Sequence, residues 1–234
     1  MQKTNYGQAR LSIVPMRAKP QHSSEMVSQL LYNETYTILE EQEEWLRIEC
    51  LHDGYQGWIA ENQAYYISQE IFDTPFKRYN ADVIEWDQQL EMNLFMGSPF
   101  YDIAPNLVPP IERICHAAQQ FINSPYLWGG RTGAGIDCSG LMQVAFRMGH
   151  ILLPRDASLQ AKLGKKISWG THKRGDLAFF KNKDGKINHV GLFLSPDSIL
   201  HASAWVRVDS ITKIGIFHKN SATHELAFIR RVRF

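Results

Sequence analysis

The chain has 234 residues, of which 44% are hydrophobic and 21% charged, and this composition excludes a disordered chain, a collagen-like repeat and a coiled coil. Its 25 Lys and Arg against 24 Asp and Glu leave a formal net charge of +1. We therefore expect no nucleic-acid partner, because such proteins carry a larger basic excess. The apolar runs are far shorter than the roughly 20 residues that cross a bilayer, so we expect no membrane partner either.

The N-terminal ten residues contain neither an apolar core nor a small-residue cleavage site. The sequence as given therefore predicts a cytoplasmic protein, although a signal peptide removed beforehand would leave no trace. The three cysteines, Cys50, Cys115 and Cys138, are too few for a disulfide framework and leave at least one thiol. A thiol fits a reducing compartment.

Residues 1–68 are predicted to form a small β-barrel, because short strand patterns follow each other closely with almost no helical periodicity. Apolar and polar residues alternate over residues 45–50, as in a half-buried strand, after an acidic turn at residues 40–44. Asp53-Gly54 is a turn signal. Residues 69–108 contain prolines and scattered aromatic residues, and we interpret them as a linker packed on both neighbouring domains.

Residues 109–234 are predicted to form an α+β domain, because helical periodicity comes first and strand periodicity later. Apolar residues at helical spacing run from Ile111 to Ile122. A second helix over residues 138–148 is expected to end with Gly149 at the C′ position. The expected strands of an antiparallel sheet span residues 176–181, 189–195, 199–205 and 226–234.

A glycine-rich loop over residues 129–135 precedes Cys138. The sequence argues against a phosphate-binding loop, because no Gly-Lys-Ser/Thr follows and no strand of a βαβ unit precedes. The loop instead delivers Cys138 to the first turn of a helix, where N–H groups and the helix dipole stabilise a thiolate. We therefore expect Cys138 to be a nucleophile, and Cys50 and Cys115 to be inert buried thiols.

Two histidines on successive predicted strands, His189 and His201, supply the base that a cysteine nucleophile needs. Zinc is the competing use of these residues, but separations of 51 residues from Cys138 to His189 and 12 from His189 to His201 differ from zinc motifs. We expect no metal and no other cofactor. A hairpin with a regular even loop would pair His189 with Ala204 and turn His201 to the opposite face. We therefore expect an odd loop or a β-bulge.

These motifs, in this order, resemble the NlpC/P60 cysteine peptidases. The motifs are Tyr126-Leu-Trp-Gly-Gly, Asp137-Cys-Ser-Gly, Arg155-Asp-Ala-Ser158, Gly175-Asp-Leu, Asn188-His-Val-Gly and His201. The resemblance covers about residues 109–234 and implies a papain-like domain with helices packed on an antiparallel sheet. Residues 1–68 are similar to a bacterial SH3 (SH3b) barrel through Trp45-Leu-Arg and Asp53-Gly-Tyr-Gln-Gly-Trp58.

The resemblance implies a role for each matching residue. Cys138 would attack the substrate carbonyl, His189 would act as general base and then as acid, and His201 would orient His189. The hydroxyl of Tyr126 and the backbone N–H of Cys138 would form the oxyanion hole. From the residues alone, the alternative for Tyr126 is a core aromatic before a turn.

Asp137 has two interpretations. A carboxylate beside a thiolate raises the pKa of the thiol, so its plain role is the N-cap of the helix. The resemblance implies that it also binds the ammonium of an N-terminal L-Ala. The pocket residues so implied are Trp128, Asp137, Ser139, Ser158 and, closing the pocket, Glu34.

Glu34 is otherwise an exposed turn carboxylate. Buried carboxylates without a cation repel each other, which makes an ammonium their natural partner. Tyr55 and Tyr66 are both candidates to join Glu34.

The combination of domains resembles the γ-D-glutamyl-L-diamino acid endopeptidases, also called dipeptidyl-peptidase VI. It implies a monomer that hydrolyses the bond from γ-D-Glu to diaminopimelate or Lys in murein stem peptides with a free N-terminal L-Ala, and releases L-Ala-γ-D-Glu. Two alternatives stay open. One is an acyltransferase or amidase on the same Cys-His-His scaffold, and the other is a non-catalytic wall-binding protein led by the SH3b-like unit.

Overall fold

The computed structural model describes residues 4–101 and 108–232. The chain divides into a first compact unit of residues 1–107 with 128–133, and a second of residues 108–127 with 134–234. The loop over residues 128–133 thus groups with the first unit, whereas the sequence placed it in the domain over residues 109–234. Within the described parts of the chain, no helix is long and apolar enough to cross a bilayer.

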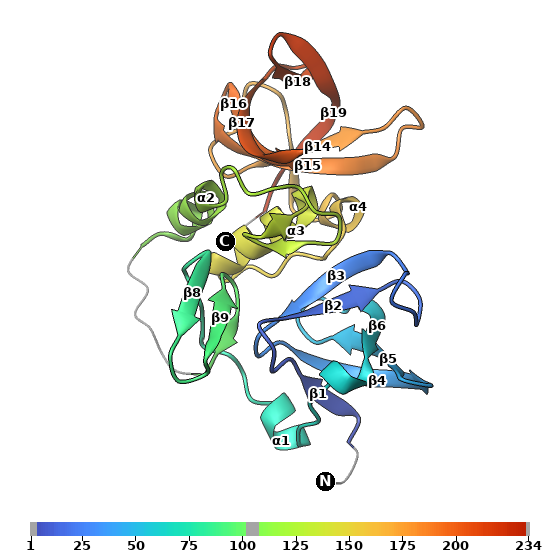
Figure 1. Ribbon diagram of the computed structural model, residues 1–234. Coiled ribbons are helices and arrows are strands. Elements are labelled where there is room, and N and C mark those ends of the chain that lie inside the picture. Colours follow the sequence, from blue (N-terminus) through green and yellow to red (C-terminus); the bar gives the residue numbers. More distant parts are fainter. Residues whose placement is uncertain (1–3, 102–107, 233–234) are drawn as a thin grey trace. The chain divides into compact units, whose positions relative to one another are not determined.

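The first unit is built on a six-stranded antiparallel sheet (Figure 1). Its strands, in the order in which they pair, are β1 (Tyr6–Gln8), β4 (Thr35–Gln42), β5 (Trp45–Cys50), β6 (Gln56–Ala60), β2 (Ile13–Arg17) and β3 (Met26–Leu31). The alternation in β5 directs Leu46, Ile48 and Cys50 into the core, as predicted. This arrangement confirms the SH3b-like barrel. The acidic turn is shorter than predicted, because β4 continues to Gln42.

Residues 69–101, which the sequence assigned to a linker, carry their own secondary structure and group with the first unit. They contain α1 (Gln69–Phe72), the hairpin of β8 (Ile84–Asp87) and β9 (Met92–Phe95), and the pair of β7 (Arg78–Tyr79) and β10 (Pro99–Phe100). The rest of the predicted linker, residues 102–107, lies outside the described residues. The short strand β11 (Arg131–Thr132) also belongs to this unit.

The second unit contains a seven-stranded antiparallel sheet with helices packed against it (Figure 1). The strands, in pairing order, are β13 (Lys165–Ile167), β19 (Ser221–Arg231), β14 (Leu177–Lys181), β15 (Ile187–Ser195), β16 (Ser198–Ser203), β17 (Trp205–Ile211) and β18 (Gly215–His218). Because β18 also pairs with β19, the last six strands of this order close into a ring.

Three helices complete the second unit. After the short strand β12 (Gly135–Ile136), α3 (Cys138–Met148) packs against β15 and β16, and α4 (Ala157–Gln160) packs against β15. The helix α2 (Pro110–Gln120) packs on α3. Helices on an antiparallel sheet confirm the predicted α+β class.

The C-terminal end of α3 differs from the prediction in one position. Gly149 is the C-cap with φ −87°, and His150 takes the left-handed C′ position with φ 61°. The N–H groups of His150 and Ile151 bond back to carbonyls of the last turn, which is a Schellman motif. Gly149 instead leaves room for the Ile114 side chain of α2, whose Cδ1 would lie 2.6 Å from a Cβ at this position and would have to move.

The predicted strand over residues 199–205 is in fact divided between two strands. Ala204, with φ 63°, lies between β16 and β17, where the chain reverses. The sequence prediction therefore stopped at the start of β17 and missed β18. The last strand begins at Ser221, earlier than predicted, and the predicted residues 233–234 lie outside the described residues.

Candidate active site

Cys138 is the first residue of α3, as the glycine-rich loop predicted. The Asp137 side chain accepts a hydrogen bond of 2.7 Å from the backbone N–H of Gly140, which confirms Asp137 as the N-cap. The Cys138 side chain is 6% exposed, and its sulfur lies against the backbone of Val190, the residue after His189. The nucleophile therefore lies next to β15 and not in open solvent.

The register of the β15–β16 hairpin places His201 beside His189. Leu192 pairs with Leu200, and a β-bulge follows before Ser195. The predicted bulge is confirmed, and the two imidazoles meet: Nε2 of His189 lies 2.9 Å from Nδ1 of His201. The two rings are nearly perpendicular, with 84° between their planes.

Asp209 in β17 is hydrogen-bonded to His201 on the side away from His189, and the sequence prediction missed it. Its Oδ2 lies 3.0 Å from Nε2 of His201 and accepts a hydrogen bond of 2.8 Å from Nε of Arg207. Its Oδ1 lies 2.8 Å from Nδ1 of His218 in β18. The available signal was the alternating pattern after Trp205, which would have extended the strand prediction to Asp209.

Burial raises the pKa of the Cys138 thiol to about 12, and the neighbouring charge of Asp137 adds to the increase. The backbone of Val190 and Ser139 and the guanidinium of Arg155 act in the opposite direction but do not offset the burial. The helix N-terminus therefore does not produce a resting thiolate, in contrast to our expectation. Burial also lowers the pKa of His189 well below 6.5. At neutral pH the pair is a thiol and a neutral imidazole.

We expect the pH profile to reflect this neutral pair. Protonation removes the lone pair with which His189 acts as a base, so kcat/KM should fall only below about pH 6.5 and stay flat to about pH 9. The groups that face His189 are His201 from β16, His224 from β19 and Arg207 from β17, and each lowers its pKa further. The measurement is kcat/KM of a defined peptide against pH, together with the rate of alkylation by iodoacetamide.

The alkylation rate provides the control for this profile. With a protonated resting thiol, it should rise steadily up to about pH 9. Rapid alkylation with a plateau below about pH 6 would instead reveal a thiolate–imidazolium pair and contradict the neutral resting state.

Asp137 already has a cation as its partner. Arg155 binds both of its carboxylate oxygens, with Nη1 3.0 Å from Oδ1 and Nη2 2.5 Å from Oδ2, and also donates to the Ser139 hydroxyl over 2.9 Å. The Ser139 hydroxyl also donates to Asp137 Oδ1 over 3.2 Å, so the two residues that the sequence assigned to one pocket are in contact, but the sequence prediction missed Arg155 as their partner. The premise that Asp137 lacks a cation is wrong.

Tyr126 and Ser158 differ in their environments. The backbone N–H of Tyr126 donates to the Ala204 carbonyl over 2.9 Å. Burial raises the pKa of Tyr126, and the neighbouring charges of Cys138 and Asp137 add to the increase, so its hydroxyl remains a donor. Ser158 is exposed in the first turn of α4.

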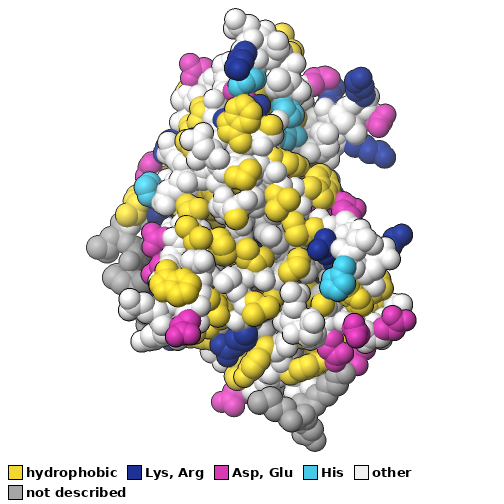
Figure 2. All heavy atoms as spheres, viewed as in Figure 1, with side chains coloured by type: hydrophobic (Ala, Val, Ile, Leu, Met, Phe, Trp, Pro, Cys, Tyr) yellow, Lys and Arg dark blue, Asp and Glu magenta, His cyan; other side chains and the backbone are white. Residues whose placement is uncertain are grey.

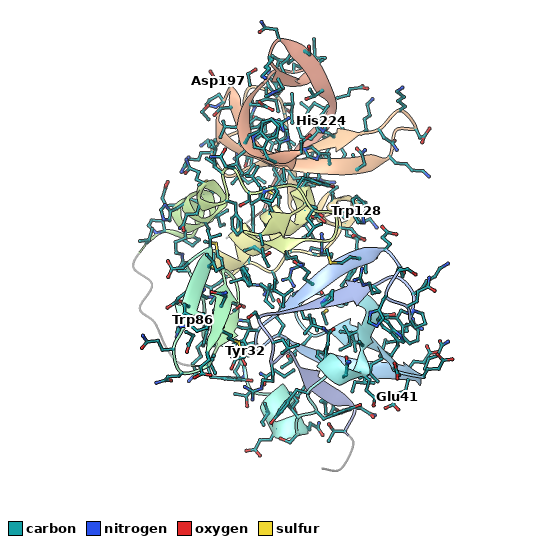
Figure 3. The ribbon with its side chains drawn as sticks, in the orientation of Figure 1. Tyr32, Glu41, Trp86, Trp128, Asp197 and His224 are labelled. Carbon is teal, nitrogen blue, oxygen red and sulfur yellow. The ribbon has the colours of Figure 1, made fainter. Side chains whose placement is uncertain are left out.

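Glu34 and Trp128 belong to the first unit. Glu34 follows a turn in which Asn33 has φ 68°, and its carboxylate is 2% exposed. Nη1 and Nη2 of Arg131 each lie 2.8 Å from one of its oxygens. The alternative of an exposed turn carboxylate is therefore wrong, and so is the premise of an unpaired charge. Trp128, labelled in Figure 3, is 58% exposed, and its indole N–H donates to Glu25.

Histidine side chains gather at the surface over the sheet of the second unit (Figure 2). Potential ligand atoms of His189, His201 and His224 lie within 4.8 Å of one another. The His224 ring, labelled in Figure 3, stacks on His189 with 4.2 Å between centroids and 25° between planes. Lone pairs in stacked rings do not converge on one ion, so this arrangement suits proton transfer better than metal binding. A second potential donor group in the first unit comprises Cys50, His52 and Asp53.

The fold is that of a papain-like domain that follows an SH3-type barrel in the sequence, and the candidate site has the residues of a cysteine peptidase. Residues 123–223 match the NlpC/P60 family, and residues 16–63 match the bacterial dipeptidyl-peptidase SH3 domain. The chain therefore contains an NlpC/P60 domain preceded by an SH3 domain of that type.

The chain is also similar to several known proteins. The chain is 44% identical to a γ-D-glutamyl-L-lysine dipeptidyl-peptidase of Bacillus subtilis over 39% of its own length and 31% of that relative. It is 26% identical to the dipeptidyl-peptidase 6 of Lysinibacillus sphaericus, over 80% of this chain and 83% of the relative. The crystal structure of an NlpC/P60 family protein from Bacillus cereus has the same fold, with a TM-score of 0.81 at 16% identity over 97% of this chain and 99% of that one.

Proposed function

We propose that the protein is a cysteine peptidase that hydrolyses the γ-D-glutamyl–L-diamino acid bond of murein stem peptides with a free N-terminal L-Ala, and releases L-Ala-γ-D-Glu. The observation that carries this proposal is a buried thiol at a helix N-terminus that contacts the backbone of Val190, the residue after His189, which is itself hydrogen-bonded to His201. The names of the relatives from Bacillus subtilis and Lysinibacillus sphaericus support the choice of bond and the release of a dipeptide.

The reaction begins from neutral groups. His189 takes the proton of Cys138 while Sγ bonds to the γ-glutamyl carbonyl carbon, so the thiolate forms only as it attacks. The protonated His189 then gives this proton to the amine of the departing diamino acid as the C–N bond breaks. Water, activated by the same His189, attacks the thioester and releases the dipeptide acid together with the Cys138 thiol.

The tetrahedral intermediate carries a negative oxygen that needs donors. The N–H of Cys138 is at the first position of α3 and therefore has no carbonyl partner within the helix. The hydroxyl of Tyr126, protonated at any ordinary pH because of its raised pKa, supplies the second donor. One lost oxyanion donor typically costs about 3–4 kcal/mol of transition-state stabilisation.

We expect the enzyme to prefer a free N-terminus. The comparison is between L-Ala-γ-D-Glu-L-Lys, or its diaminopimelate equivalent, and the N-acetylated peptide, with products followed by mass spectrometry. Since a charged hydrogen bond contributes roughly 1.5–3 kcal/mol, acetylation should lower kcat/KM by about 10- to 100-fold. Arg155 already balances the charge of Asp137, so the ammonium serves recognition and is not needed to neutralise a buried carboxylate.

Two variants sharpen this comparison. Asp137→Asn keeps a side chain that can cap α3 but removes the charge. It should therefore reduce the ratio of kcat/KM for the free peptide to kcat/KM for the acetylated peptide. Lys183→Ala changes an exposed residue between β14 and β15 and should leave the ratio unchanged. Equal kcat/KM for the free and the acetylated peptide would reject recognition of the amine.

Acyl transfer is the second candidate, because the same histidine arrangement can pass the thioester to an amine in place of water. Product analysis with and without added amines separates the two reactions.

A preference for peptides with a free N-terminal amine suits peptides that are already detached from the wall. We accordingly propose that the protein reclaims such peptides in the cytoplasm.

A further inference from the structure

We propose that Asp209 is a positioning residue that sets the tautomers of His201 and His189 and so decides which nitrogen of His189 can act as the base. This inference rests on the proposed function for its catalytic consequence, whereas the tautomers themselves belong to the resting protein. The residues form a row across four strands that pair in succession: His189 on β15, His201 on β16, Asp209 on β17 and His218 on β18.

Sheet register creates this row. His201 pairs directly with Arg207, and Ile199 with Asp209, so Asp209 lies diagonally next to His201 on the same face of the sheet. The pairing of Ser210 with Phe217 brings His218 beside Asp209 from the other side. His201 is fully buried and Asp209 is 9% exposed, so water does not compete freely for their hydrogen bonds.

The assignment of protons follows from Asp209. The carboxylate of Asp209 contacts His201, Arg207 and His218. Burial raises the pKa of this carboxylate, but the three hydrogen bonds outweigh burial and keep the pKa below its ordinary value. An ionised carboxylate only accepts, so His201 must carry its proton on Nε2. The other nitrogen of a neutral His201, Nδ1, then accepts.

His201 is neutral, because burial lowers its pKa to about 4. Its Nδ1 therefore accepts the proton of Nε2 of His189 over the 2.9 Å that separates them. The lone pair of His189 is left on Nδ1, and this atom takes the thiol proton of Cys138. Without Asp209, His201 can carry its proton on Nδ1 and donate to His189, which moves the proton of His189 to Nδ1 and blocks the base.

Arg207 determines which variants test the proposal. Its Nε–H donates to the same oxygen, Oδ2, that faces His201. In Asp209→Asn, Arg207 therefore requires the amide oxygen, not the NH2 group, at this position. The asparagine should preserve both tautomers, whereas Asp209→Ala removes the acceptor. Asp184→Ala, at an exposed carboxylate between β14 and β15, is the matched control.

The experiment measures histidine tautomers by 15N NMR of the full chain without substrate, together with kinetics and thermal unfolding. In the wild type, Asp209→Asn and Asp184→Ala, we expect the proton on Nε2 of both His189 and His201. In Asp209→Ala, we expect Nδ1–H forms to appear and kcat to fall by about 100-fold or more, with KM changed less than about threefold.

Two results would overturn the inference: an Nδ1–H form of His201 in the wild type, or unchanged tautomers in Asp209→Ala. A lower melting temperature with unchanged tautomers would show that Asp209 is only structural. If the tautomers shift as expected while the wild type hydrolyses no murein peptide, the proposed function fails and the assignment of protons by Asp209 stands.

Discussion

Replacing Cys138 by alanine is expected to lower the turnover of the proposed murein peptide substrates by more than about 10⁴-fold, because it removes the thiol that forms the acyl intermediate in the proposed mechanism. The side chain shrinks by a single sulfur at the start of α3, where Asp137 still caps the helix. The melting temperature should therefore change little. The measurement is single-turnover hydrolysis with dipeptide release followed by mass spectrometry.

Cys115→Ala is the matched control for this experiment. Cys115 is a fully buried thiol in α2, and burial raises its pKa to about 11, so the variant should keep full activity. His189→Ala should be nearly as severe as Cys138→Ala, because both belong to one catalytic unit, and His201→Ala should be milder. Loss of activity in His201→Ala but not in His189→Ala would reverse the assigned roles.

Replacing Arg131 by methionine is expected to destabilise the first unit by about 3–5 kcal/mol, because it removes the guanidinium that balances the buried charge of Glu34 and leaves this carboxylate with the Leu31 N–H and His52. Arg131 is 1% exposed, and its guanidinium binds both oxygens of Glu34 and the backbone carbonyl of Gln29. Methionine keeps an unbranched apolar side chain but is shorter than arginine and supplies no donor. The free energy of unfolding from urea titration gives the loss.

Arg47→Met in the same unit is the control, because Arg47 pairs with Glu40 at 3.4 Å while both side chains are about half exposed. Such a surface pair contributes at most about 1 kcal/mol. Adding Glu34→Gln to Arg131→Met removes the buried charge and should restore part of the stability. Equal losses for Arg131→Met and Arg47→Met would show that the Glu34–Arg131 pair has no special role.

The local pattern of the sequence was sufficient for the elements that carry the nucleophile. Helical periodicity after a glycine-rich loop gave α3 its bounds and Cys138 its place at the first helical position, and Asp137 its role as N-cap. Alternation predicted β5 residue by residue. Side chains alternate between the two faces of a sheet, so a regular even loop would place the two histidines on opposite faces. An irregular β15–β16 hairpin was therefore required for them to meet, and the bulge is present. These features depend on residues that are close in sequence, and such local relations can be read from the spacing of apolar residues and from the alternation of side chains along a strand.

The ionic partners depended on tertiary structure. Asp209 lies 8 residues from His201, Arg155 lies 18 from Asp137, and Arg131 lies 97 from Glu34. Which cation meets which carboxylate depends on strand order, register and the path of a loop, and no local period encodes these. For the same reason, the sequence suggested unpaired carboxylates awaiting an ammonium, whereas the folded chain supplies an arginine to each.

The state of the nucleophile also depended on burial. From sequence, the helix N-terminus predicts a thiolate at Cys138, because the dipole and the N–H groups are local properties of the helix. The pKa of the Cys138 thiol depends on these local effects and on the loss of contact with solvent. The loss of solvent in turn depends on how β15 covers the sulfur. The sequence by itself therefore determined the fold class and selected the candidate nucleophile and its two candidate histidine partners. Tertiary packing decided their protonation and their ionic partners, because solvation and long-range contacts exist only in the folded chain.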